Sequence, residues 1–117
     1  MKSLIRSPFT NQDATSAAQS DVFSPQRLVD ENGAWQIQFS KDPGGSASGT
    51  LKLMGRMTPA MGWAEIDSVN ISAFTGISAY PHAVISADVD IVPQMRVEIV
   101  SPSSVAADTK VTVRVME

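Results

Sequence analysis

Three side chains in this sequence have the chemistry for a reactive or metal-binding site. His82 is the single histidine, but a nucleophilic triad also needs a nearby serine and carboxylate, and no Gly-x-Ser-x-Gly motif is present. Asp88 and Asp90 share one face of a predicted strand, whereas calcium takes about six to eight oxygen ligands. We therefore predict a surface histidine, a solvated carboxylate pair and no catalytic, cofactor or metal site. The chain is not expected to be an enzyme.

Three aromatic side chains have the shape for stacking against a sugar or a base. Trp35, Trp63 and Tyr80 can each present a flat ring to a ligand. Each stands at the head of a series of alternating apolar residues, which is typical of a strand with one buried face. We therefore predict core positions for these rings, with a stacking platform as the alternative.

The methionines suggest a contact surface. The sequence has six of them, and Met54, Met57, Met61 and Met116 do not all fit the inward-facing positions of the predicted strands. A flexible thioether side chain adapts well to the surface of a partner. Some of these methionines are therefore predicted to line a surface that binds another protein.

Alternation of apolar and polar residues predicts the strands that must position these side chains. It is clearest where Trp35, Ile37 and Phe39 share one face, and where Leu51 and Leu53 do the same. The predicted strands cover residues 34–40, 50–54, 83–91, 95–100 and 110–116, with two short strands within 63–71. In the strand over 83–91, the inner face is expected to carry Ala83, Ile85, Ala87, Val89 and Ile91.

Turn residues separate these strands. Residues 30–33 end in Asn-Gly, a strong hairpin-turn signal because both residues tolerate positive φ. Residues 41–48 contain two glycines but predict an exposed loop, because a phosphate-binding loop needs Gly-Lys-Ser/Thr at the start of a helix. Pro59 and Gly62 mark a further turn or loop.

Six or seven closely spaced strands, frequent Gly, Pro and Ser, and no helical periodicity predict an all-β fold. We expect an antiparallel two-layer β-sandwich or jelly roll with an extended N-terminal arm. The strands over 95–100 and 110–116 are expected to pair with each other, which would place Glu98 opposite Arg114 or Lys110.

The first twenty residues contain few large apolar side chains, so they bury too little surface to offset the entropy lost on ordering. We predict a flexible arm over residues 1–20 and a β-sandwich domain over 21–117. Leu4, Ile5 and Phe9 are the candidate partner-binding residues of the arm, expected to order in grooves of a neighbouring subunit. A frayed terminus is the alternative.

Composition excludes several classes of partner. A net charge of −3 with scattered basic residues argues against nucleic-acid binding. No apolar run approaches the roughly 18 to 20 residues of a membrane span, and no membrane partner is expected. The N-terminal residues lack the pattern of a secretory signal, so we expect a protein that is made and assembled in the cytoplasm. Cysteine is absent, which excludes disulfides and thiolate chemistry.

Several short stretches carry a family likeness. They are Gly49-Thr50-Leu51-Lys52-Leu53-Met54-Gly55, Gly62-Trp63, Pro93-Gln94-Met95-Arg96-Val97 and the valine-rich last strand. Over residues 34–117 this pattern resembles the small β-sandwich proteins of tailed-phage virions. In that pattern a Gly-Thr-Leu strand is followed by a Trp, and the Pro-x-x-Arg-Val strand pairs with the last one. Residues 57–61 depart from it, because such proteins commonly carry a polar Asp-Gly turn there.

The resemblance implies a non-enzymatic virion protein, most simply a capsid decoration or cement protein that bridges major capsid subunits. Its partner would be the major capsid protein or another virion protein, its location the virion, and its form a homotrimer where three capsid subunits meet. The alternative is a tail-associated or host-adhesion module that binds surface carbohydrate. A hydrolase ranks last because the acid, base and nucleophile partners are missing.

Overall fold

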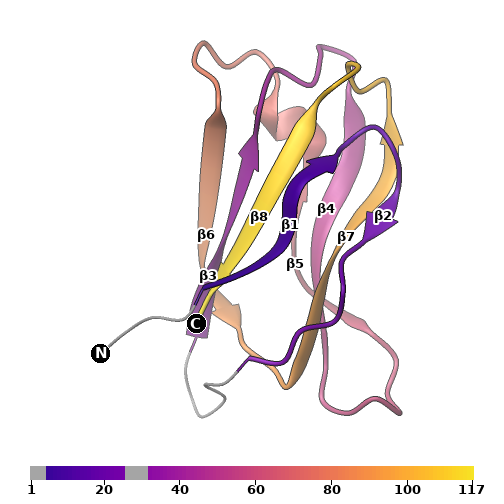
Figure 1. The fold of residues 1–117 in the computed structure, drawn as a ribbon, viewed down its shortest axis with the longest axis vertical. Coiled ribbons are helices and arrows are strands. Elements are labelled where there is room, and N and C mark those ends of the chain that lie inside the picture. The colour runs from indigo at the N-terminus through magenta and orange to yellow at the C-terminus, as the bar shows by residue number, and fades with distance from the viewer. Residues whose placement is uncertain (1–4, 26–31) are drawn as a thin grey trace.

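Two antiparallel sheets pack face to face in a computed structural model, which describes residues 5–25 and 32–117 (Figure 1). The first sheet has the order β1 (Ile5–Asp13), β8 (Lys110–Met116), β3 (Asn32–Phe39) and β6 (His82–Asp90). The second sheet has the order β2 (Ala18–Gln19), β7 (Gln94–Ser103), β4 (Ser48–Arg56) and β5 (Ala64–Asn70). A short 3-10 helix, η1 (Ile71–Phe74), follows β5. The predicted all-β sandwich is confirmed.

The core lies between the two sheets and is made by alternate residues of the central strands. Trp35, Ile37 and Phe39 of β3 are fully buried, as their alternation predicted. Leu51 and Leu53 of β4 are fully buried in the second sheet. Burial of one such side chain contributes about 1.5–3 kcal/mol, so the contact between the sheets is a main source of stability.

β7 and β8 follow each other in the chain but belong to different sheets. β7 pairs with β4 and β2, whereas β8 pairs with β3 and β1. The predicted pairing of these two strands is therefore wrong. Glu98 lies opposite Lys52, and Arg114 lies opposite Gln36. Both strands have one apolar face, and that alternation is the same whether two strands pair side by side or face each other across the core.

Residues 5–20 belong to the sandwich. The sequence had instead predicted a flexible arm over residues 1–20 and a sandwich that begins at residue 21. β1 pairs antiparallel with β8, and Phe9 is only 3% exposed in the core. Ile5, on the same strand, is 59% exposed. Backbone pairing with β8 supplies the order that the few apolar side chains of this segment would not supply alone. Leu4 lies outside the described residues.

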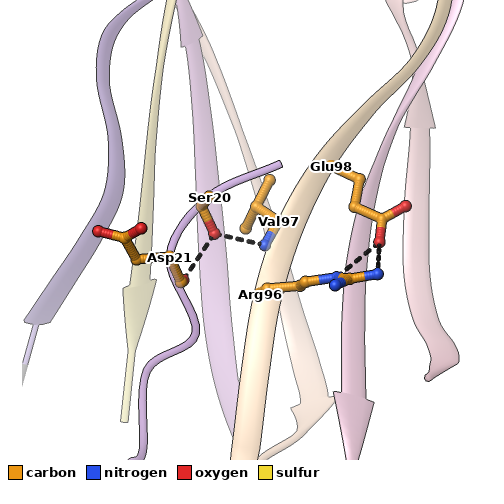
Figure 2. Close-up of polar contacts among 5 residues, drawn as sticks. All are labelled: Ser20, Asp21, Arg96, Val97 and Glu98. Carbon is orange, nitrogen blue, oxygen red and sulfur yellow. Dashed lines mark hydrogen bonds and ion pairs between the residues drawn. The ribbon is translucent and has the colours of Figure 1, made fainter. Parts of the chain in front are cut away.

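The chain then crosses to the second sheet and runs along β7 (Figure 1). Beyond β2, the Ser20 amide donates a hydrogen bond to the Val97 carbonyl at 2.8 Å. The Ser20 hydroxyl accepts one from the Val97 amide at 2.9 Å (Figure 2). Phe23 and Met95 then exchange two backbone hydrogen bonds, at 2.9 and 3.0 Å. One continuous segment therefore contributes to both sheets and ties them together.

A bulge divides β6 into two registers. The ladder with β3 shifts between Ala87 and Val89, which leaves Asp88 as an extra residue with a φ of 62°. The face on which side chains lie reverses across such an insertion. Val89 is buried as predicted, whereas Ile85, predicted to face inward, is 62% exposed, and Ala87 is exposed as well.

Asn32 and Gly33 begin β3 instead of forming the predicted hairpin turn. A Cβ on Gly33 would lie 2.3 Å from the Met116 carbonyl oxygen and 2.7 Å from Ile91 Cδ1. The glycine is therefore required by the close approach of neighbouring groups rather than by a turn. Residues 30–31, the first half of the predicted turn, lie outside the described residues.

Candidate functional site

One end of the sandwich carries two exposed methionines. Loop 57–63 joins β4 to β5 and lies at the same end of the molecule as the C-terminus (Figure 1). The Met61 amide donates a hydrogen bond to the Thr58 carbonyl at 3.1 Å, which closes a turn around Pro59, where the sequence predicted a turn or loop. This turn holds Met57 and Met61 at the surface, where they are 56% and 52% exposed.

A pocket of about 300 Å³ lies beside this loop. Its apolar lining includes Met57, Met61, Ile66 and Val92. Its charged lining residues are Arg56, Glu65 and Asp90. A pocket that combines apolar walls with a few charged groups is suited to an apolar side chain of a partner, with polar contacts at the rim.

Gly55 allows the apolar wall of this pocket to pack against β4. A Cβ at this position would lie 2.4 Å from Val92 Cγ2 and 2.6 Å from Ile66 Cδ1. Both separations are far shorter than the roughly 3.5–4.0 Å of an ordinary carbon–carbon contact. Any larger residue would displace the two side chains, so the glycine that ends the strand predicted over residues 50–54 has a packing role.

Trp63 lies on the outer surface of the second sheet and not in the core as predicted. Its side chain is half-buried, and the guanidinium carbons of Arg56 and Arg96 lie 4.2 and 4.4 Å from the ring centroid. The core prediction is confirmed for Trp35, which is fully buried. A sugar-stacking platform needs an uncovered ring face, and here two guanidinium groups compete with a ligand for the ring of Trp63.

Arg96 also forms an ion pair that is largely shielded from solvent. Its Nε and one terminal nitrogen both lie 2.7 Å from Glu98 Oε2 (Figure 2). The two side chains are 20% and 13% exposed. The Nε of Arg56 instead donates to the side-chain oxygen of Gln94 at 2.8 Å, and this amide carries no charge to balance the guanidinium. The two arginines on Trp63 are therefore held by different partners.

The carboxylate of Asp67 lies between the two sheets. Nothing in the sequence indicated that this side chain faces inward or accepts hydrogen bonds. It accepts hydrogen bonds from the Trp35 indole at 2.8 Å, the Ser86 hydroxyl at 2.7 Å and the Ser68 amide at 2.9 Å. Burial raises the pKa of Asp67, but these three hydrogen bonds outweigh burial and hold the pKa below its ordinary value of 3.8. A carboxylate that accepts three hydrogen bonds and stays ionised is suited to joining strands, not to donating a proton.

His82 and the pair Asp88 and Asp90, the other candidates for chemistry, lie toward opposite ends of β6. His82 is half-buried beside the rings of Phe74 and Tyr80, while Asp88 and Asp90 are exposed. Tyr80 is half-buried and donates a hydrogen bond to the Phe74 carbonyl. Within residues 5–25 and 32–117, no three His, Cys, Asp or Glu side chains are grouped so that they could hold a metal ion. No helix in that part of the chain is long and apolar enough to cross a membrane.

Ile5 and Phe9, the two predicted arm residues that the structure describes, do not share a contact surface. Phe9 is in the core, Ile5 is exposed on the edge strand β1, and Leu4 lies outside the described residues.

The exposure of Ile85 was not predicted from the sequence, because the bulge at Asp88 that turns this side chain outward leaves no signal in the alternation. The exposed apolar side chains therefore lie mainly at the methionine loop and along the sheet edges.

Comparison with protein-family models, with curated proteins and with solved structures finds no match to this chain.

Proposed function

We propose that this protein is a non-enzymatic structural component of a tailed-phage virion, which decorates the capsid shell by binding capsid subunits. The observation that carries the proposal is the pair of exposed methionines, Met57 and Met61, beside an apolar pocket at one end of the sandwich. Exposed apolar groups gathered at a turn add nothing to the core of the protein itself, but they gain free energy when a partner covers them.

The resemblance to virion sandwich proteins adds support at the same end. Trp63 and Arg96 both belong to the stretches that carry the likeness, and they meet beside the methionine loop with 4.4 Å between the guanidinium carbon and the ring centroid. One part of the pattern differs, because β7 pairs with β4 and β2 rather than with the last strand. The proposal therefore rests on the methionine end of the sandwich more than on strand pairing.

Co-sedimentation with undecorated shells, assembled from the major capsid protein of the proposed phage, tests the proposal. The wild-type protein should bind the shells saturably. The double variant Met57→Glu/Met61→Glu should bind at least tenfold more weakly, because it places charge where an apolar contact is expected. Met57→Leu/Met61→Leu keeps the apolar surface and should bind like the wild type.

A matched control lies at the opposite end of β4. Ser46 is exposed in the loop before that strand. A strand rises about 3.3 Å per residue, which places Ser46 about 30 Å from Arg56 at the other end of β4. Ser46→Glu adds the same single charge as Met57→Glu or Met61→Glu alone, but at a distance, and unlike either single variant it should leave binding unchanged. No saturable binding by the wild-type protein overturns capsid decoration, and equal loss in Ser46→Glu overturns the assignment to the methionine end.

A further inference from the structure

Each sheet of the sandwich has two edge strands. They are β1 and β6 in the first sheet, and β2 and β5 in the second. An edge strand presents a row of backbone N–H and C=O groups that have no neighbouring strand, and so it is a template for pairing with another chain. Proteins usually protect such edges with proline, charge, bulges or very short strands.

Three of the four edges have these protections. β1 contains Pro8 and two shifts in its register with β8. β2 is only two residues long. β5 carries Glu65 and Asp67, and its register with β4 shifts so that Ile66 is an extra residue. These edges are therefore poor templates for a further strand.

The fourth edge is unprotected over most of its length. Residues 82–87 of β6 read His-Ala-Val-Ile-Ser-Ala, with no proline and no Asp, Glu, Lys or Arg. They pair with β3 without a register shift, and the bulge comes only at Asp88. Near the middle of this segment Ile85 is 62% exposed, the largest exposure among the large apolar side chains of the described residues. A regular, uncharged edge with an exposed isoleucine is the kind that a further strand extends.

The segment is also complementary to itself. A second copy placed antiparallel about a two-fold axis at Ile85 sets Ile85 opposite Ile85, Ala83 opposite Ala87, Val84 opposite Ser86 and His82 opposite Asp88. No like charges face each other in this register, because Asp88 lies opposite His82 and the other paired positions carry no charged side chain. An isologous contact of this kind closes on itself, because each subunit uses the same surface.

We propose that β6 pairs antiparallel with β6 of a second copy of this chain, forming a two-fold dimer in which the first sheets of the two subunits become one eight-stranded sheet. A three-fold ring, as implied by the resemblance to virion proteins, would need a contact between two different surfaces of the chain, and the other edges are protected. The dimer forms in solution without a capsid, so its test is independent of the proposed function.

Sedimentation equilibrium of the wild-type protein is the first measurement. The mass should rise from 12.5 kDa toward twice that value as concentration increases. Ile85→Lys places a charge on the pairing edge and should keep the protein monomeric over the same range. Ile5→Lys is the matched control, because Ile5 is 59% exposed on the opposite edge of the same sheet, and this variant should dimerise like the wild type.

A single cysteine tests the register. The chain has no cysteine, so any disulfide in Ile85→Cys joins two molecules. Directly opposed Cβ atoms on antiparallel strands lie about 4.5–5.5 Å apart, which small shifts bring to disulfide distance. Mild oxidation should cross-link Ile85→Cys and not Ile5→Cys. A monomeric wild type, an unchanged dimer in Ile85→Lys, or equal cross-linking of the two cysteine variants overturns the proposal.

Discussion

The indole of Trp35 donates a hydrogen bond to the carboxylate of Asp67 across 2.8 Å, and this bond joins the two sheets of the sandwich. Trp35 comes from β3 in the first sheet and Asp67 from β5 in the second. Ser86 of β6 adds a second bond to the same carboxylate oxygen at 2.7 Å. The two edge strands β5 and β6 are thereby held together by one side chain.

Replacement of Asp67 should destabilise the fold. Asp67→Ala leaves the fully buried Trp35 indole without its acceptor, which costs about 1–3 kcal/mol for an unsatisfied buried group. Asp67→Asn keeps one side-chain oxygen and should lose less. Urea unfolding followed by tryptophan fluorescence gives both values, and Ser68→Ala, at an exposed neighbour, serves as control. An alanine variant as stable as the wild type would show that the bond is not maintained in solution.

The same carboxylate makes stability depend on pH. The pKa of Asp67 is lower in the folded protein than its ordinary value of 3.8, so the unfolded chain binds a proton more readily. The stabilisation is therefore complete above pH 3.8 and is lost as the pH falls through the folded-state pKa. The difference in unfolding free energy between wild type and Asp67→Asn should shrink over that interval. A difference that stays constant from pH 6 to about pH 3 would contradict this assignment.

Truncation of Phe9 tests whether the N-terminal segment belongs to the core. Phe9→Ala should cost about 3–5 kcal/mol, the usual range for a buried phenylalanine. Ile5→Ala, on the same strand but exposed, should change stability by no more than about 0.5 kcal/mol. Chemical unfolding of the two variants in parallel measures the contrast. Equal, small effects would favour the detached arm expected from the sequence.

A methyl group added at Gly55 should strain the pocket wall. Gly55→Ala brings a Cβ to 2.4 Å from Val92 Cγ2, and overpacking of this kind costs about 1–3 kcal/mol. Gly62→Ala is the control, because nothing lies within 4 Å of the added atom. The two melting temperatures should differ by several degrees at this chain length. If both alanine variants melt together, the close packing of Val92 and Ile66 on β4 is refuted.

The two arginines that contact Trp63 should contribute unequally to the stability of the fold. Arg96→Ala removes a cation–π contact and leaves Glu98, only 13% exposed, without its ion-pair partner. An unpaired charged group with little exposure costs about 1–3 kcal/mol or more. Arg56→Ala removes a comparable contact with Trp63 but leaves only a neutral amide unpaired, and should cost less. Unfolding free energies of the two variants decide the order, and the reverse order contradicts the described ion pair.

Alternation predicted the central strands well because each has one face fully in the core. β8 has the predicted bounds, and β3, β4 and β7 differ by a few residues at their ends. Period-two alternation reports which face is buried, but not which strand lies alongside. The pairing of β7 with β8 was therefore predicted wrongly from the same pattern that located both strands correctly.

Three features could not be predicted from the sequence: the bulge in β6, the strand β1 and the role of Asp67. The extra residue at Asp88 reverses the faces of β6, and nothing in the local sequence distinguishes a bulge from continued alternation. β1 was missed because it is polar and contains Pro8, which resembles an unstructured segment until β8 supplies its hydrogen bonds. Asp67 was missed because an inward-facing carboxylate is recognisable only once Trp35 and Ser86 lie beside it.

The pairing of β1 with β8 also sets the order in which the protein can be completed during synthesis. β1 leaves the ribosome before the other described strands, but its partner β8 leaves after them, and β8 lies between β1 and β3 in the first sheet. That sheet cannot close until β8 has been translated, and contacts this distant in sequence form slowly. Until then the edges of β1 and β3 that β8 will occupy are open, so loss of the last seven-residue strand would expose two neighbours at once.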